Sequence, residues 1–201
     1  MSPADLIRRH LTESAAVKQR LADSAAVPII VEAARQLADR VARGGKIMLC
    51  GNGGSAADSQ HIAAEFTSRL RASMERPGIP AIALTTDTSF LTARANDYGF
   101  DDVFERLIDS LGRPEDALIG ISTSGTSRNV VRAVTRSREK GILTIGLLGG
   151  TGGALAGIVD LPIVVPSDST QHIQESHIAI GHILCELVEE MLYGNLQQSH
   201  V

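Results

Sequence analysis

From Lys46 onward, short and continuously apolar runs alternate with segments of helical periodicity, and this alternation limits the folds open to the chain. The apolar runs are KIMLC (46–50), AIALT (81–85), DALIGIS (116–122), ILTIGLL (142–148) and LPIVVP (161–166). Continuous apolar strands separated by helices are typical of a parallel sheet that is covered on both faces. Such sheets bind ligands beyond the carboxyl ends of their strands.

Helical patterns fill the rest of the 201-residue chain. Before Lys46 the apolar residues recur at helix spacing and Gly44-Gly45 ends the pattern, so we expect helices and no strand there. The later helices are expected at 55–70, from about 88 to 110, at 127–140 and from about 171 to 193. We therefore predict a single α/β domain over 1–201, with helices in 1–44 and a three-layer core with a five-stranded parallel sheet in 45–201.

Composition excludes several classes of protein. Hydrophobic residues make up 43% and charged residues 21% of the chain, and the net charge is −4 without a basic patch, so we predict no nucleic-acid partner. The first residues lack the apolar core of a signal peptide, and Cys50 and Cys185 lie in apolar surroundings without metal-binding spacing, which favours the cytoplasm. The uncharged run Gly141–Val159 is rich in glycine, so we expect a strand, a turn and a short helix, and no membrane span.

Two polar turns follow strands and open helices. In CGNGGSA, the glycines let backbone N–H groups approach a ligand, and Ser55 is expected to cap the helix; an ordinary strand-to-helix turn explains the motif about as well. In STSGTS (122–127), five hydroxyls and a helix N-terminus suit a phosphate group. The alternative there is a polar turn with Ser127 as an N-cap, and we favour the anion site.

Histidines accompany oxygen-bearing side chains on two of the helices. His61 and Glu65 stand four residues apart on one helix face, and Arg69 is expected to continue that stripe. The alternative is a solvated ladder of charges. The last helix carries Gln174 with His177 and His182, between which helix geometry alone does not choose. Histidines with carboxylate or amide oxygens on two helices make a zinc site possible.

These motifs together resemble those of the phosphoheptose isomerases, a family with the sugar isomerase (SIS) fold. The resemblance covers nearly the whole chain. It rests on CGNGGSAADSQHIAAEF, RPGIPAIALTTDTS, ANDYGF, ISTSGTS and IQESHIAIGHI, in that order. One segment departs from the family pattern: Gln171-His172 precedes the Ile-Gln pair, where an acidic or basic residue is common in the family.

The resemblance implies a site and a reaction. It implies one zinc ion per subunit, held by His61, Glu65, Gln174 and His182. It implies a sugar phosphate substrate, whose contacts would be Asn52, Gly53, Gly54, Ser55, Glu65, Arg69, Asn96, Asp97, Ser122, Thr123, Ser124, Ser127 and Gln174. Glu65 would be the catalytic base and His182 the acid. The family is usually a homotetramer with sites at subunit interfaces, so the last helix could face a neighbour's sheet.

Three functions follow from this resemblance. The first is isomerisation of sedoheptulose 7-phosphate to an aldoheptose phosphate, through an enediol. The second is a non-enzymatic regulator that binds the replication initiator DnaA; the presence of both Glu65 and His182 argues against it. The third is an isomerase or etherase that acts on another sugar phosphate, and the zinc set argues against that function.

Overall fold

The computed structural model describes residues 1–194 and contains a five-stranded sheet in the order β2-β1-β3-β4-β5. The strands are β1 (Ile47–Gly51), β2 (Ala81–Ala83), β3 (Ala117–Ser122), β4 (Leu143–Gly149) and β5 (Leu161–Val165). All neighbouring strands run parallel, which confirms the predicted sheet. The strand order reverses between β1 and β3, so their carboxyl ends flank the topological switch point.

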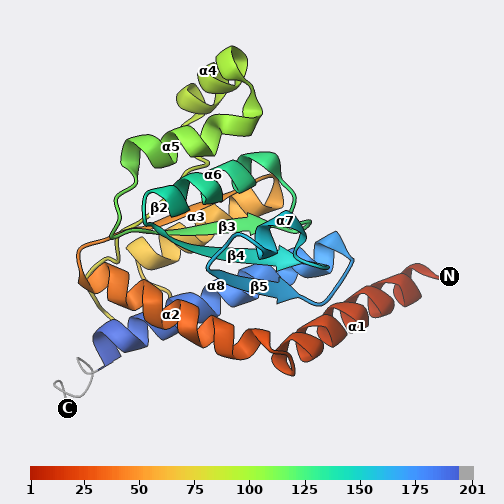
Figure 1. Ribbon diagram of the computed structural model, residues 1–201. Helices are drawn as coiled ribbons and strands as arrows, with labels where there is room; N and C mark the ends of the chain where they lie inside the picture. The colour runs from red at the N-terminus through yellow and green to blue at the C-terminus, as the bar shows by residue number, and fades with distance from the viewer. Residues whose placement is uncertain (195–201) are drawn as a thin grey trace.

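Helices cover both faces of this sheet (Figure 1). They are α1 (Pro3–Ala22), α2 (Ala26–Ala42), α3 (Gly54–Thr67), α4 (Thr88–Tyr98), α5 (Val103–Leu111), α6 (Arg128–Glu139), α7 (Gly153–Ala156) and α8 (Thr170–Tyr193), with a 3-10 turn η1 (Phe100–Asp102). The core on one face combines residues of α2, α3 and α8, and the core on the other combines residues of α5, α6 and α7. Consequently α3 and α8 lie on the same side of the sheet.

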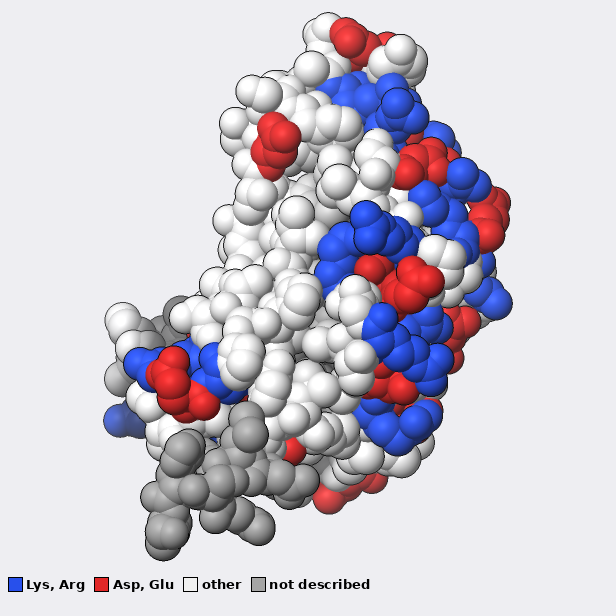
Figure 2. Space-filling model, turned by 90° about the vertical axis from the view of Figure 1, so that its left-hand side faces the viewer, with Lys and Arg blue, Asp and Glu red and all other residues white. Residues whose placement is uncertain are grey.

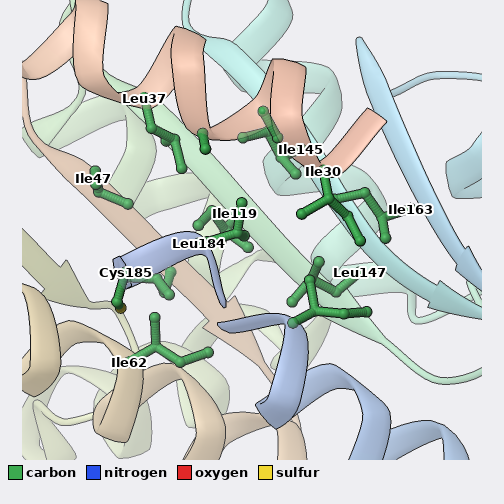
Figure 3. Packing of buried hydrophobic residues seen from close by; sticks show 14 of the residues in the cluster. Ile30, Leu37, Ile47, Ile62, Ile119, Ile145, Leu147, Ile163, Leu184 and Cys185 are labelled. Atoms are coloured by element: carbon green, nitrogen blue, oxygen red, sulfur yellow. The ribbon is translucent and has the colours of Figure 1, made fainter. Parts of the chain in front are cut away.

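The two cores are built from alternate residues of the strands, as the pleat of a strand requires. Ile47 and Leu49 of β1 belong to the core under α2, α3 and α8, whereas Met48 and Cys50 belong to the other core. Figure 3 shows Ile62 of α3 and Leu184 and Cys185 of α8 packed beside strand residues of the first core. Both cysteines are fully buried, as predicted, and burial raises the pKa of Cys50 to about 12.

Two expectations about the helices are wrong in detail. The helix expected from about 88 to 110 is broken after Tyr98, because Gly99 takes a φ of +91° that ends α4. Helix α3 ends at Thr67, so Arg69 lies beyond the helix and does not continue its stripe.

The glycine-rich segment 141–159 forms β4 and α7, as expected. Within residues 1–194, none of the helices combines the length and the apolar character that crossing a membrane requires.

Gly181 of α8 packs directly against Ile62 of α3. A Cβ atom placed on Gly181 would stand 2.4 Å from Cδ1 of Ile62, a side chain that is completely buried. Contacts between carbon atoms are favourable only at about 3.5–4.0 Å, so only glycine fits at this position without movement of its neighbours. His61 precedes Ile62 and His182 follows Gly181, so this contact also sets the approach of the two histidines.

Replacing Gly181 with alanine is therefore expected to destabilise the protein by about 1–3 kcal/mol, the usual cost of inserting a methyl group into a filled core. Gly157→Ala is the matched control, because a Cβ on Gly157 would stand 3.8 Å from the carbonyl oxygen of Ala154, an ordinary van der Waals contact. Urea unfolding of both variants measures the difference. Equal stability of the two variants would show that α8 is not held against α3 at this point.

His177 fixes α8 to the sheet. Its Nε2 lies 3.0 Å from the carbonyl oxygen of Leu148 on β4, and its side chain is completely buried. Burial lowers the pKa of His177 from 6.5 to about 4, although the hydrogen bond to Leu148 opposes this shift. The imidazole is therefore neutral in the folded protein at neutral pH.

This pKa predicts how stability depends on pH. Between pH 6.5 and pH 4 the unfolded chain binds a proton at His177 and the folded chain does not, so stability falls as the pH falls through this window. The slope from this one group approaches about 1.4 kcal/mol per pH unit. His177→Gln, which keeps a hydrogen-bond donor, is expected to lose that part of the slope in urea unfolding measured from pH 7 to 4.5. Parallel curves for the two proteins would contradict the assignment.

Candidate functional site

Three of the predicted zinc ligands meet between α3 and α8 of a single chain. Nε2 of His61 on α3 lies 2.8 Å from Nε2 of His182 on α8, and the two rings meet edge to face with centroids 5.1 Å apart. The same nitrogen of His61 lies 3.5 Å from Oε1 of Glu65, one turn further along α3. The structure thus brings His182 to this cluster and places His177 in the core, a choice that helix geometry alone had left open.

The fourth predicted ligand, Gln174, contacts a carboxylate that the sequence analysis did not include in the site. Nε2 of Gln174 donates a hydrogen bond of 2.7 Å to Oδ1 of Asp58, whose side chain is almost fully buried. The other oxygen, Oδ2, is buried and has no hydrogen-bond partner among residues 1–194. Burial raises the pKa of Asp58, and the hydrogen bond from Gln174 and the charges of His61 and His182 oppose this shift.

The two distances from His61 are compatible with a divalent metal ion. Two ligands at about 2.1 Å from a tetrahedral zinc ion lie about 3.4 Å apart, and the distances of His61 to His182 and to Glu65, 2.8 and 3.5 Å, fall on either side of that value. A cation there would also compensate the unpaired carboxylate oxygen of Asp58, whose burial is otherwise unfavourable. Asp58 is recognisable from sequence only through its spacing of three residues before His61.

A buried ion pair holds the end of α3 and hence the position of Glu65. Arg76 and Glu189 are both completely buried at their side chains and are joined at 2.6 Å. Arg76 also donates to the carbonyl oxygens of Glu65 and Phe66, both at 2.9 Å. Sequence patterns gave no sign of this pair, because the partners are separated by more than a hundred residues. Arg69 pairs with the exposed Glu75 at 2.5 Å, and its role as a substrate contact stays a prediction.

The turn after β1 begins α3 differently from the prediction. Gly53 is the N-cap residue with φ +55°, so glycine is favoured there by its backbone conformation. Ser55, which we expected to be the cap, is a buried residue inside the first turn of α3, so that expectation is wrong. Asn52 forms two amide hydrogen bonds of 2.9 Å with Asn129 on α6, a buried residue that the sequence analysis missed. This pair ties the turn after β1 to the helix after β3.

The hydroxyl-rich loop after β3 is ordered by its own side chains. Oγ of Ser122 lies 3.0 Å from Oγ of Ser127 and accepts a hydrogen bond from the backbone of Gly125. Ser124 and Thr126 are joined by their hydroxyls, also at 3.0 Å. The side chain of Ser127 makes no capping hydrogen bond within the described chain, so the reading of this loop as a plain helix cap loses its main support. The loop leads directly into the N-terminus of α6.

Two adjoining hollows lie at the carboxyl edge of the sheet and share Thr123 and Thr170. The first has a volume of about 270 Å³ and is lined by Asn52, Gly54, Ser55, Thr123, Thr170, Gln171 and Gln174. The second has about 300 Å³ and its lining includes Thr123, Ser124, Gly149, Gly150, Asp168 and Thr170. Predicted substrate contacts from both polar turns and from α8 therefore face one region, as the switch-point rule predicts.

Asn96 and Asp97 are not part of these hollows. Both are exposed on α4, which stands away from the sheet at the top of Figure 1, and Nδ2 of Asn96 donates to Asp97. Their predicted role as substrate contacts stays a prediction.

A larger hollow, of about 930 Å³, lies at the opposite edge of the sheet. It is lined by Lys46, Asp116 and neighbouring residues at the amino ends of β1 and β3, and it contains no predicted site residue among those described. Lys46 and Asp116 form an ion pair of 2.5 Å there.

On the face shown in Figure 2, basic and acidic side chains are interleaved along one side, next to a broad uncharged area. This face therefore carries no surface of a single sign that would suit nucleic acid.

Comparison with known proteins identifies the family. Residues 10–149 match the model of the SIS domain. The chain is 52% identical over 196 residues to a phosphoheptose isomerase of Roseiflexus sp. (strain RS-1), covering 96% of this chain and 98% of that one. It is 53% identical over 191 residues to a phosphoheptose isomerase of Chlorobaculum tepidum, covering 94% and 90%.

Solved structures agree with the sequences. The phosphoheptose isomerase of Neisseria gonorrhoeae superimposes with a TM-score of 0.88 at 42% identity, and that of Francisella tularensis with 0.90 at 37%. Each superposition covers 94% of this chain and 100% of the other. The parallel sheet, the paired histidines between α3 and α8 and these similarities lead to one conclusion: the chain belongs to the SIS-domain family and, within it, to the phosphoheptose isomerases.

Proposed function

We propose that this protein converts sedoheptulose 7-phosphate to D-glycero-D-manno-heptose 7-phosphate, the first step in making nucleotide-activated heptose. The proposal rests on the cluster of His61, Glu65 and His182. Gln174, which bonds to Asp58 one turn before His61, lines the hollow that also contains Thr123 of the hydroxyl-rich loop. The names of the relatives support this choice of reaction. The sequence alone had led to the same hypothesis.

The substrate's phosphate is assigned to the loop from Ser122 to Ser127. This loop offers hydroxyls, backbone N–H groups and the N-terminus of α6, all of which favour an anion. The turn after β1, with Asn52 and the backbone of Gly53 and Gly54, would contact the sugar. Substrate bound in this way would extend from the loop toward α8.

The reaction moves one proton from C1 to C2 and one from the C1 oxygen to the C2 oxygen, through an enediol. Glu65 is the proposed base at carbon, because it is a partly buried carboxylate at the cluster. His182 is the proposed acid that transfers the proton between the oxygens, because an imidazole both donates and accepts near neutral pH. The ion pair of Arg76 with Glu189 holds the end of α3, so Glu65 is positioned by the core.

We further propose one zinc ion per subunit, held by His61, Glu65, Gln174 and His182. When bound, the ion would stabilise negative charge on the substrate oxygens. Asp58 would hold Gln174 through the hydrogen bond at the amide nitrogen, which leaves the amide oxygen to face the ion.

A homotetramer in the cytoplasm is part of this proposal. Large apolar side chains are exposed along α1, α2 and α8: Leu6, Ile7, Leu11, Val27, Val31 and Ile183. Some of them line an apolar hollow of about 490 Å³ between these helices. Contiguous apolar surface of this kind is typical of protein–protein contact.

The test of the proposed function is incubation of the purified protein with zinc and sedoheptulose 7-phosphate. We expect an aldoheptose phosphate to appear in anion-exchange chromatography, and much slower turnover of fructose 6-phosphate. Absence of any aldoheptose product, together with tight binding of DnaA, would favour the regulatory alternative. Turnover of a different sugar phosphate alone would favour the third function.

Glu65→Gln separates the base from the metal ligand. This variant keeps the shape and one oxygen donor but removes the basicity, so turnover should fall by roughly 100-fold or more while zinc is retained at least in part. His182→Ala removes the acid and a ligand together, so both turnover and zinc content should fall. The exposed Glu139→Gln is the control for the chemical change. Near-normal turnover of Glu65→Gln would move the base elsewhere, with Asp58 and Asp97 as the next candidates.

A further inference from the structure

A second cluster of histidines and a carboxylate lies where α1 passes the beginning of α8. It consists of His10 on α1 with His172 and Glu175 on α8, and one ligand atom of each lies within 4.8 Å of the others. The rings of His10 and His172 have centroids 4.7 Å apart. His172 and Glu175 are three residues apart and share a helix face, whereas Gln174 is turned roughly 200° from His172 around the axis. The cluster is therefore separate from the site of His61 and His182.

His172 is buried with one ring nitrogen, Nε2, unsatisfied within residues 1–194. Its residue is only 5% exposed, and its Nε2 has no hydrogen-bond partner in the described part of the chain. A buried polar atom without a partner costs about 1–3 kcal/mol, so such atoms are rare unless a water or an ion satisfies them. The unpaired nitrogen of a neutral imidazole is also the atom that binds a metal ion.

The distance between His10 and Glu175 suits a small transition-metal ion, and the ligand atom of His172 lies within 4.8 Å of both. Nε2 of His10 lies 3.4 Å from Oε1 of Glu175, which equals the separation of about 3.4 Å between two ligands of a tetrahedral zinc ion. His10 is about half exposed at its side chain, so its ring is able to turn toward His172 without disturbing the core. Two imidazoles and one carboxylate form a ligand set that zinc accepts, with a fourth position left for water.

Contacts with the second oxygen of Glu175 fix the orientation of this carboxylate. Oε2 of Glu175 accepts a hydrogen bond from the hydroxyl of Ser14 and lies 3.5 Å from Nζ of Lys18. Ser14 in turn accepts a hydrogen bond of 2.6 Å from Lys18. Support of a ligand by hydrogen bonds to its second oxygen is a regular feature of metal sites. Oε1 is the oxygen that this arrangement directs toward His10.

We propose that His10, His172 and Glu175 form a second zinc site, which fastens the N-terminal helix to the core. The buried residues of α1 are Ser14, Val17 and Leu21, so its first ten residues are exposed, and Figure 1 shows this end standing away from the sheet. His10 contacts His172 and Glu175 of α8 within this exposed half of α1. A metal ion there would add a link between the first half of α1 and α8 of the same chain.

The test is the zinc content of purified protein and of its His10→Ala variant. His10 is exposed, so its removal should not affect folding. Equilibrium dialysis against zinc at low micromolar concentration should give about one ion fewer per chain for His10→Ala than for the wild type. Glu13→Gln is the control, because Glu13 is an exposed carboxylate on the same helix that contacts Arg9. Its zinc content should equal that of the wild type.

A second measurement removes the proposed catalytic site from the comparison. In a His61→Ala/His182→Ala background, zinc should still bind, and adding His10→Ala should weaken binding at least tenfold. Zinc should also slow hydrogen exchange of the amides of residues 3–13, and His10→Ala should abolish this slowing. Equal zinc content of His10→Ala, Glu13→Gln and wild type would overturn the second site. Loss of all zinc binding in the His61→Ala/His182→Ala variant would also overturn it, provided that the circular dichroism of this variant matches that of the wild type.

Discussion

The contact between Gly181 and Ile62 is the constraint on which the site depends. It lets α8 approach α3 more closely than any residue with a side chain would permit. The residues next to these two in the chain are His61 and His182, which therefore meet at 2.8 Å. A site built in this way is as precise as the core beneath it, because a shift of either helix would require repacking of completely buried side chains.

The parallel sheet brings the two polar turns of the site together. The strand order reverses between β1 and β3, so the turns after both strands emerge at the same place. The amide pair of Asn52 and Asn129 joins these turns, and the hydroxyls of Ser122 and Ser127 order the loop that follows β3. An anion held there would be bound by neutral donors and the dipole of α6, without a lysine or arginine in the loop.

Sequence reasoning found the sheet and both polar turns because these features are local. Continuous apolar runs report strands buried on both faces, and hydroxyls or glycines that follow a strand are visible in the sequence itself. It could not choose between His177 and His182, since periodicity gives the direction of a side chain on a helix but not the neighbour that it meets. The structure separates them, because β4 lies against one and α3 against the other.

The remaining misses have related causes. Arg76 and Glu189, Asn52 and Asn129, and Gln174 and Asp58 are pairs whose members lie far apart in the chain, so no local pattern reports them. Ser55 was mistaken for a helix cap because the positive φ of Gly53 is a property of the backbone that composition does not reveal. Arg69 was placed on α3 because periodicity continued past Thr67, where the helix actually ends.

The most direct measurement of this account is a crystal structure of the Glu65→Gln variant with zinc and sedoheptulose 7-phosphate. The account predicts that the phosphate lies on the loop from Ser122 to Ser127 and that C1 and C2 face His61 and His182. It also predicts an anomalous zinc peak between these two histidines. A phosphate bound at the opposite edge of the sheet beside Lys46, or a sugar whose C1 and C2 lie far from both histidines, would contradict it.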